Sequence, residues 1–86
     1  MGEKEVGTVE NYFSKISVAV VRISGGEVAV GSNIAIRGTT TDVTQVVESI
    51  QVEHSSVESA GTGDLVGLKV SEKVRPNDKV YIVTDD

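Results

Sequence analysis

Residues 24–38 read SGGEVAVGSNIAIRG, residues 60–70 read AGTGDLVGLKV and residues 77–83 read NDKVYIV. In each segment glycine, aspartate or asparagine stands next to a short run rich in valine and isoleucine. Such runs favour β-strands, and the residues between them favour tight turns. The order of these segments predicts a small closed β-barrel, in which the chain turns back after every few residues.

Length and cysteine content make one compact all-β domain the expected solution. The chain has 86 residues and no cysteine, so it has room for one hydrophobic core and cannot form a disulfide. Closing the sheet pairs every edge strand around that core. We therefore expect a flexible N-terminal tail over residues 1–5 and a single β-barrel domain over residues 6–84.

The predicted strands are short, and no segment has the period of an ordinary helix. They span residues 5–13, 15–23, 27–30, 33–37, 42–54, 65–70 and 79–84, with at most one helical turn at 55–60. The second of these strands is apolar on both faces, and Glu48 in the longest one predicts a bulge or bend. These features favour a closed, six- to seven-stranded antiparallel barrel over a sandwich.

The charge balance argues against strong nucleic-acid binding by the chain alone. Thirteen acids and eight bases give a net charge of −5, whereas nucleic acid is normally held by lysine and arginine. The net charge favours a soluble monomer. The sequence has neither the apolar run of about 20 residues that spans a bilayer nor a signal-peptide core, which predicts a cytoplasmic protein.

Several short motifs resemble a known family. Residues 28–36, VAVGSNIAI, and residues 50–60, IQVEHSSVESA, followed by GDLVGL at 63–68, resemble domain II of elongation factor Tu and related translational GTPases. The start GTVENYFSKISVAVV at 7–21 is similar to stand-alone proteins described as translation elongation factor-like. A related barrel closes the carboxyl end of some collagenase-like peptidases.

The resemblance implies a β-barrel that contacts tRNA or ribosomal RNA within larger complexes. The chain lacks the G-x-x-x-x-G-K-[ST] loop that holds nucleotide phosphates, so we expect no GTP binding by the chain itself and no cofactor. Asp64 and Asp78 each stand just before a strand, where a carboxylate can accept hydrogen bonds from turn amides. The resemblance implies the architecture more strongly than it implies an activity.

No residue pattern predicts a catalytic or metal site. His54 is the only histidine, and its neighbours Glu53, Ser55 and Ser56 supply neither a triad nor a ligand set. We interpret it as a surface residue at a strand end. The GTGD run at 61–64 lacks a following helix, so it is interpreted as a turn between strands and not as a phosphate loop.

Two groups of residues are candidates for contacts with RNA or a partner. Lys69, Lys73, Arg75 and Lys79 place half of the basic residues within eleven positions, as a basic rim or as solvated edge lysines. Tyr12 and Lys15 lie around Phe13 and could stack a base. Alternatively, Phe13 plugs the barrel end and Tyr12 covers a neighbouring strand.

Three interpretations of function remain open. The first is a non-catalytic module that contacts ribosomal RNA, tRNA or a translation protein through the basic rim. The alternative is a protein–protein adaptor, related to the C-terminal barrel of collagenase-like peptidases, that docks through outward apolar residues of the second strand. An enzyme is the third, and it is disfavoured because the sequence offers so few catalytic groups.

Overall fold

The computed structural model describes residues 2–53 and 55–84, and in these ranges every regular element is a β-strand. The ten strands are β1 (Gly2–Phe13), β2 (Val18–Ile23), β3 (Glu27–Ala29), β4 (Asn33–Arg37), β5 (Asp42–Val46), β6 (Ile50–Val52), β7 (Ser55–Val57), β8 (Ser59–Gly61), β9 (Leu65–Lys69) and β10 (Lys79–Thr84). The described ranges contain no helix that could cross a membrane. The predicted cytoplasmic location stays a prediction.

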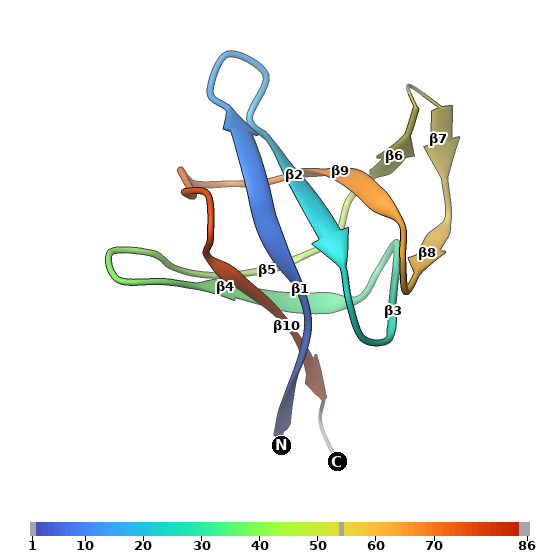
Figure 1. Cartoon of the computed structure of the whole chain (residues 1–86), viewed down its shortest axis with the longest axis horizontal. Coiled ribbons are helices and arrows are strands. Elements are labelled where there is room, and N and C mark those ends of the chain that lie inside the picture. The colour runs from blue at the N-terminus through green and yellow to red at the C-terminus, as the bar shows by residue number, and fades with distance from the viewer. Residues whose placement is uncertain (1, 54, 85–86) are drawn as a thin grey trace.

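Eight of the strands form one antiparallel sheet, in the order β5-β4-β10-β1-β2-β9-β6-β7, and β3 pairs with β8 in a second sheet. In Figure 1, β4 and β5 run at a steep angle to β1 and β2. The sheet is therefore strongly coiled. The long strand β1 links its two halves, because β1 pairs with β10 on one side and with β2 on the other.

The prediction of a closed six- to seven-stranded barrel is wrong, although the all-β antiparallel class is confirmed. In the part of the chain that the structure describes, no ladder joins the two edge strands β5 and β7. The reason lies in the predicted strand 42–54, which bends at residues 47–49. Backbone hydrogen bonds link Val47 to Gly31 and Ser32 at 2.9 and 2.8 Å, and beyond this corner β6 pairs with β9.

Short strands replace the helical turn that the sequence allowed at 55–60. Residues 55–57 form β7, which pairs with β6, and residues 59–61 form β8, which pairs with β3. The bend predicted at Glu48 is present, since this residue lies between β5 and β6. One predicted strand thus becomes two, and one predicted turn becomes two further strands.

Alternation along the strands builds the core. In β2, Ala19, Val21 and Ile23 are buried, while Val18 and Val20 are half-buried on the other face. The largest fully buried side chains come from six strands and two connections: Ile23, Ile34, Ile36, Ile50, Leu68, Val6, Val9, Val21, Val28, Val47, Val66 and Val74. They belong to one cluster, so the sheet encloses its core although it does not close.

The first residues of the described chain belong to the sheet. Residues 2–5, which the sequence assigns to a flexible tail, lie in β1 and pair with residues 81–84 of β10. Thr84 Oγ1 also donates a 3.3 Å hydrogen bond to the Gly2 carbonyl. Both ladders of β1 shift register once, between Glu5 and Gly7 on the β10 side and between Val9 and Asn11 on the β2 side. The described strand therefore begins ahead of the predicted domain boundary.

Candidate binding surfaces

The candidate aromatic residues lie at the end of β1, but not as the sequence predicts. Tyr12 is half-buried and packs against the core. Phe13 remains 47% exposed, so it does not plug the fold. Lys15 lies in the exposed β1–β2 turn. The exposed aromatic side chain is therefore Phe13.

The four basic residues near the C-terminal end are all exposed, and three of them line two different hollows. Lys69 lines a hollow with Gln45 and Ser71. Arg75 and Lys79 line a different hollow, and the lining of neither includes Lys73. Of the four, Arg75 and Lys79 line the same hollow, and the basic rim as a contact surface stays a prediction.

The described residues offer no metal centre. Within the ranges 2–53 and 55–84, no group of three or more histidine, cysteine, aspartate or glutamate side chains could hold an ion. His54 lies outside the described residues. The GTGD segment connects β8 to β9 as a turn, in which the Gly61 amide donates a 2.9 Å hydrogen bond to Asp64 Oδ2. Its interpretation as a turn is confirmed.

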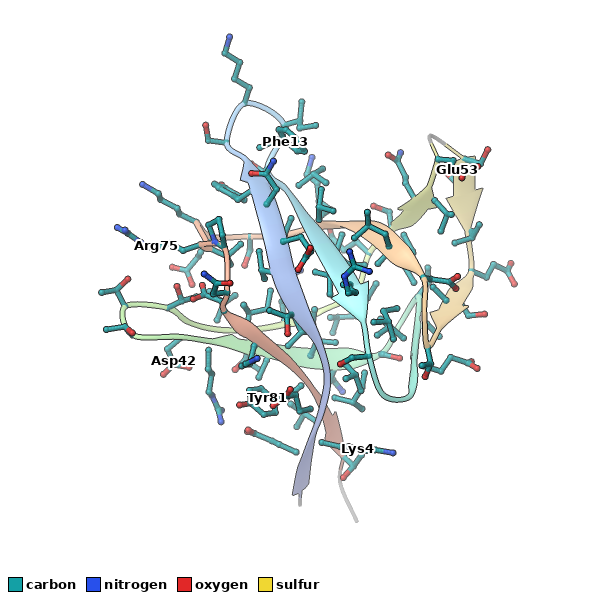
Figure 2. All side chains as sticks on the ribbon, in the orientation of Figure 1. Lys4, Phe13, Asp42, Glu53, Arg75 and Tyr81 are labelled. Atoms are coloured by element: carbon teal, nitrogen blue, oxygen red, sulfur yellow. The ribbon has the colours of Figure 1, made fainter. Side chains whose placement is uncertain are left out.

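An apolar hollow of about 270 Å³ lies on the outer side of the sheet, over strands β2 and β9. We call it the docking groove. It is lined by Phe13, Ile16, Val18, Val20, Gln51, Glu53, Leu65, Val66 and Gly67. Three of its large side chains project into solvent, with 47% of Phe13, 59% of Ile16 and 47% of Leu65 exposed. Figure 2 shows Phe13 at the end of the β1–β2 hairpin and Arg75 on another side of the molecule.

Gly67 makes the docking groove concave. It pairs with Val20 of β2 and with Gln51 of β6, so it lies where three strands run side by side. A Cβ at this position would point toward Val18, 3.2 Å from its Cγ1 atom. The missing side chain leaves a depression between the apolar residues on either side. The sequence run VGL at 66–68 indicates such a depression only when the pairing of β9 with β2 and β6 is known.

Asp78 organises the connection between β9 and β10. Its side chain is buried, and its Oδ2 atom accepts a 2.8 Å hydrogen bond from the Arg75 amide. The Val9 amide also donates a 2.8 Å bond to the Asp78 carbonyl. A Cβ at Gly38 would overlap the Asp78 carboxylate, so the two turns are packed tightly against each other. The predicted role of Asp64 and Asp78 as acceptors from turn amides is confirmed.

We expect Asp78→Ala to lower the free energy of unfolding by about 1–2 kcal/mol, because it leaves a partly buried amide without its acceptor. Urea unfolding followed by circular dichroism measures the change. Asp64→Ala is the matched control, since it removes the same kind of turn hydrogen bond at an exposed site. A loss for Asp78→Ala no larger than that of the control would contradict the role of its burial.

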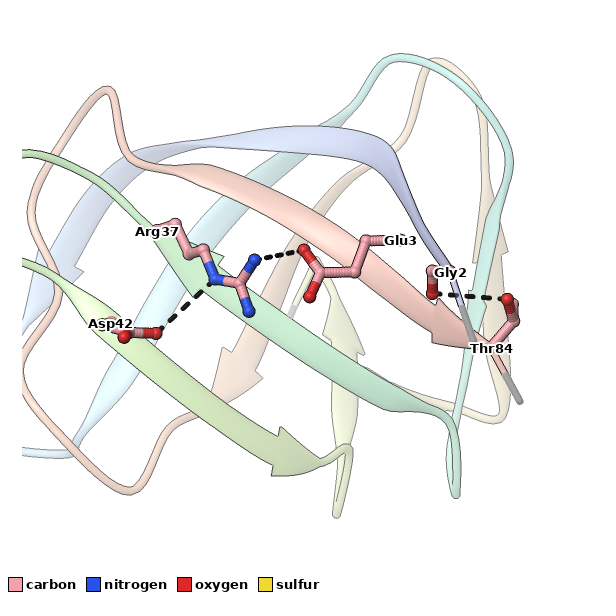
Figure 3. Close-up of polar contacts among 5 residues, drawn as sticks. All are labelled: Gly2, Glu3, Arg37, Asp42 and Thr84. Carbon is pink, nitrogen blue, oxygen red and sulfur yellow. Dashed lines mark hydrogen bonds and ion pairs between the residues drawn. The ribbon is translucent and has the colours of Figure 1, made fainter. Parts of the chain in front are cut away.

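The Arg37 side chain links β4 to β5 beside it and to β1, which lies beyond β10. Its Nη1 atom donates to Glu3 Oε1 and its Nε lies 3.5 Å from Asp42 Oδ1, as Figure 3 shows. The hydrogen bond with Glu3 is the main cause that raises the pKa of the Arg37 guanidinium, and Asp42 contributes less. The guanidinium is thus held in place by two acids from β1 and β5.

Comparison with known proteins places this chain beside peptidases. The chain is 46% identical over 77 residues to a protein named collagenase from Porphyromonas gingivalis, a match that covers 88% of this chain and 21% of that protein. It is 39% identical over 82 residues to an uncharacterized protease of Methanocaldococcus jannaschii, covering 94% of this chain and 20% of that protein. The chain therefore spans about a fifth of the length of these relatives. No protein-family profile matches it.

The fold itself has been seen in crystals. The C-terminal domain of a protein described as a U32 peptidase from Geobacillus thermoleovorans superposes with a TM-score of 0.85, at 22% sequence identity. The similarity covers 92% of this chain and 91% of that domain. At this identity the comparison shows a shared fold.

These comparisons overturn the resemblance to translation elongation factor-like proteins. The similar proteins are named collagenase and protease, and the domain with this fold is part of a U32 peptidase. The motifs at 28–36 and 63–68 lie in strands β3, β4 and β9 and in the turns next to them, so they match the architecture of the fold. The translational role and the contacts with RNA and ribosomes that it implied have no support. The comparisons favour the peptidase-related adaptor instead.

Proposed function

We propose that the chain is a non-catalytic adaptor module whose docking groove binds a collagenase-like peptidase domain. The observation that carries the proposal is the cluster of Phe13, Ile16 and Leu65, which are about half exposed around one concave surface. Contiguous exposed apolar surface around a depression is typical of a protein interface. Val18 and Val20 of β2 line the same groove.

The relatives indicate which partner the docking groove binds. Since the match covers 21% of the Porphyromonas gingivalis collagenase, about four-fifths of that protein lies outside it. In such a protein a module like this one has the rest of the peptidase chain as its nearest neighbour. An apolar face on the module gives that neighbour a surface to pack against, with Gln51 and Glu53 as polar residues of the groove lining.

The module is proposed as non-catalytic because of its side chains. One histidine and no cysteine leave few candidates for a base or a nucleophile. The residues of the docking groove are mainly aliphatic and aromatic, and its one acid is Glu53. Such a lining suits packing against another protein better than proton transfer.

The test is a binding measurement with a peptidase fragment. The fragment is the Porphyromonas gingivalis collagenase with the 77 matched residues removed, and the full chain is titrated into it by calorimetry. We expect binding, and we expect Leu65→Glu to weaken it about a hundredfold, because it places a charge in the apolar contact.

Val46→Glu is the matched control. Val46 is 49% exposed, like Leu65, but it lies on β5 outside the docking groove. This variant is expected to bind as the parent chain does. The proposal fails if the fragment does not bind, or if the two variants weaken binding equally.

A further inference from the structure

A second hollow, separate from the docking groove, lies between the β4–β5 and β9–β10 connections. It has a volume of about 340 Å³. It is lined by Arg37, Gly38, Thr39, Thr40, Arg75, Pro76, Asn77, Asp78 and Lys79. Three of these residues are cationic, in a chain whose net charge is −5. We call it the cationic hollow.

The strand register brings two of these cations directly opposite each other. Lys79 at the start of β10 pairs with Arg37 at the end of β4. Side chains that are directly opposite on antiparallel strands lie on the same face, and like charges in such a pair are destabilising. A third cation, Arg75, lines the same hollow from the preceding turn. The strand register and the turn thus bring three cationic side chains to one hollow.

The acids nearby do not neutralise all of this charge. Glu3 and Asp42 both engage Arg37. Within residues 2–53 and 55–84, neither Arg75 nor Lys79 forms an ion pair, and the Lys79 ammonium has only a 3.4 Å contact with the hydroxyl of Thr8.

Asp78, the acid of the lining itself, is directed into the protein. It is 5% exposed, and its carboxylate accepts a hydrogen bond from the Arg75 amide. The charges left available on the surface of the hollow are therefore those of Arg75 and Lys79. The exposed residues Thr39 and Thr40 add hydroxyl donors on the other side.

We propose that the cationic hollow binds an oxyanion, that is, a carboxylate or a phosphate group. Arg75 and Lys79 supply the two charges, and an arginine presents donors in a fixed fork that matches such groups. Arg37, held in place by Glu3 and Asp42, also lines the hollow. A bound oxyanion compensates the charges of Arg75 and Lys79, which no acid of the described residues pairs.

The test is a titration of the ¹⁵N-labelled full chain followed by NMR, with sodium phosphate and with sodium acetate at constant ionic strength. We expect saturable shifts confined to the amides of residues 38–40, 75 and 77–79. Arg75→Gln and Lys79→Gln are each expected to weaken binding about tenfold, or about 1.4 kcal/mol. The hydrogen bond from the Arg75 amide to Asp78 is a backbone contact, so Arg75→Gln leaves it in place.

Lys69→Gln and Lys15→Gln are the matched controls, because these exposed lysines do not line the cationic hollow. They are expected to titrate like the parent chain. Tighter binding of phosphate assigns the site to phosphate groups, and tighter binding of acetate assigns it to carboxylates. Shifts that do not saturate, or an equal loss in the controls, overturn the proposal. Leu65→Glu should leave this titration unchanged, which separates the result from that for the docking groove.

Discussion

Leu68→Ala is expected to lower the free energy of unfolding by about 3 kcal/mol, within the range of about 2–5 kcal/mol for such core truncations. Leu68 is fully buried in β9, opposite Ala19 of β2 and Ile50 of β6. Removing its side chain deletes apolar contacts with both neighbouring strands and leaves a cavity. A stability of about 0.05–0.15 kcal/mol per residue gives about 4–13 kcal/mol for 86 residues, so this loss is a large fraction of the total.

Urea unfolding followed by far-ultraviolet circular dichroism measures this loss. Leu65→Ala is the matched control, because Leu65 lies on the same strand but faces the docking groove and is 47% exposed. We expect the control to lose less than about 1 kcal/mol. Equal losses in the two variants would show that β9 does not divide into an inner and an outer face.

The local features of this fold could be predicted from the sequence. Alternation put Ala19, Val21 and Ile23 on one face of the second predicted strand, and the structure buries that face. The acids Asp64 and Asp78 were expected to accept hydrogen bonds from turn amides, as they do. Both signals act over a few residues. The period of a strand and the chemistry of a turn are written into neighbouring positions.

The features that failed depend on residues far apart in the chain. Closure was expected because a closed sheet has no edges, but the bend after β5 pairs Val47 with residues 31 and 32 instead. Phe13 was expected to fill the end of a barrel, and it is exposed because the open sheet offers no such end to fill. No local pattern encodes where a bent strand finds its next partner.

The candidate sites show the same division. The outward apolar face of β2 could be predicted, whereas the contributions of Leu65 and Gly67 follow from the pairing of β2 with β9. Arg75 and Lys79 were selected as basic residues, but Arg37 was not, because only the β4–β10 register places it opposite Lys79. The sequence left the peptidase-related adaptor open as an alternative, and comparison with whole proteins favours it over a translational role.

Gly7→Ala is expected to lower the free energy of unfolding by about 2–3 kcal/mol, because the site has no room for a methyl group. A Cβ at Gly7 would lie 2.5 Å from the carbonyl oxygen of Arg22 and 3.0 Å from Val21 Cγ1. The closer atom belongs to the backbone of β2, so a side-chain rotation cannot relieve the overlap. The strands themselves must separate.

The position of Gly7 in the sheet spreads this strain. Gly7 pairs with Ile23 of β2 and with Val80 of β10, directly after the register shift that follows Glu5. Amide hydrogen exchange should therefore quicken on both neighbouring strands in the variant. Gly2→Ala is the control on the same strand, since its Cβ would meet Thr84 Oγ1 at an ordinary 3.4 Å, and it should change stability by less than about 0.5 kcal/mol. A Gly7 variant as stable as this control would mean that β1 and β2 are farther apart than the structure places them.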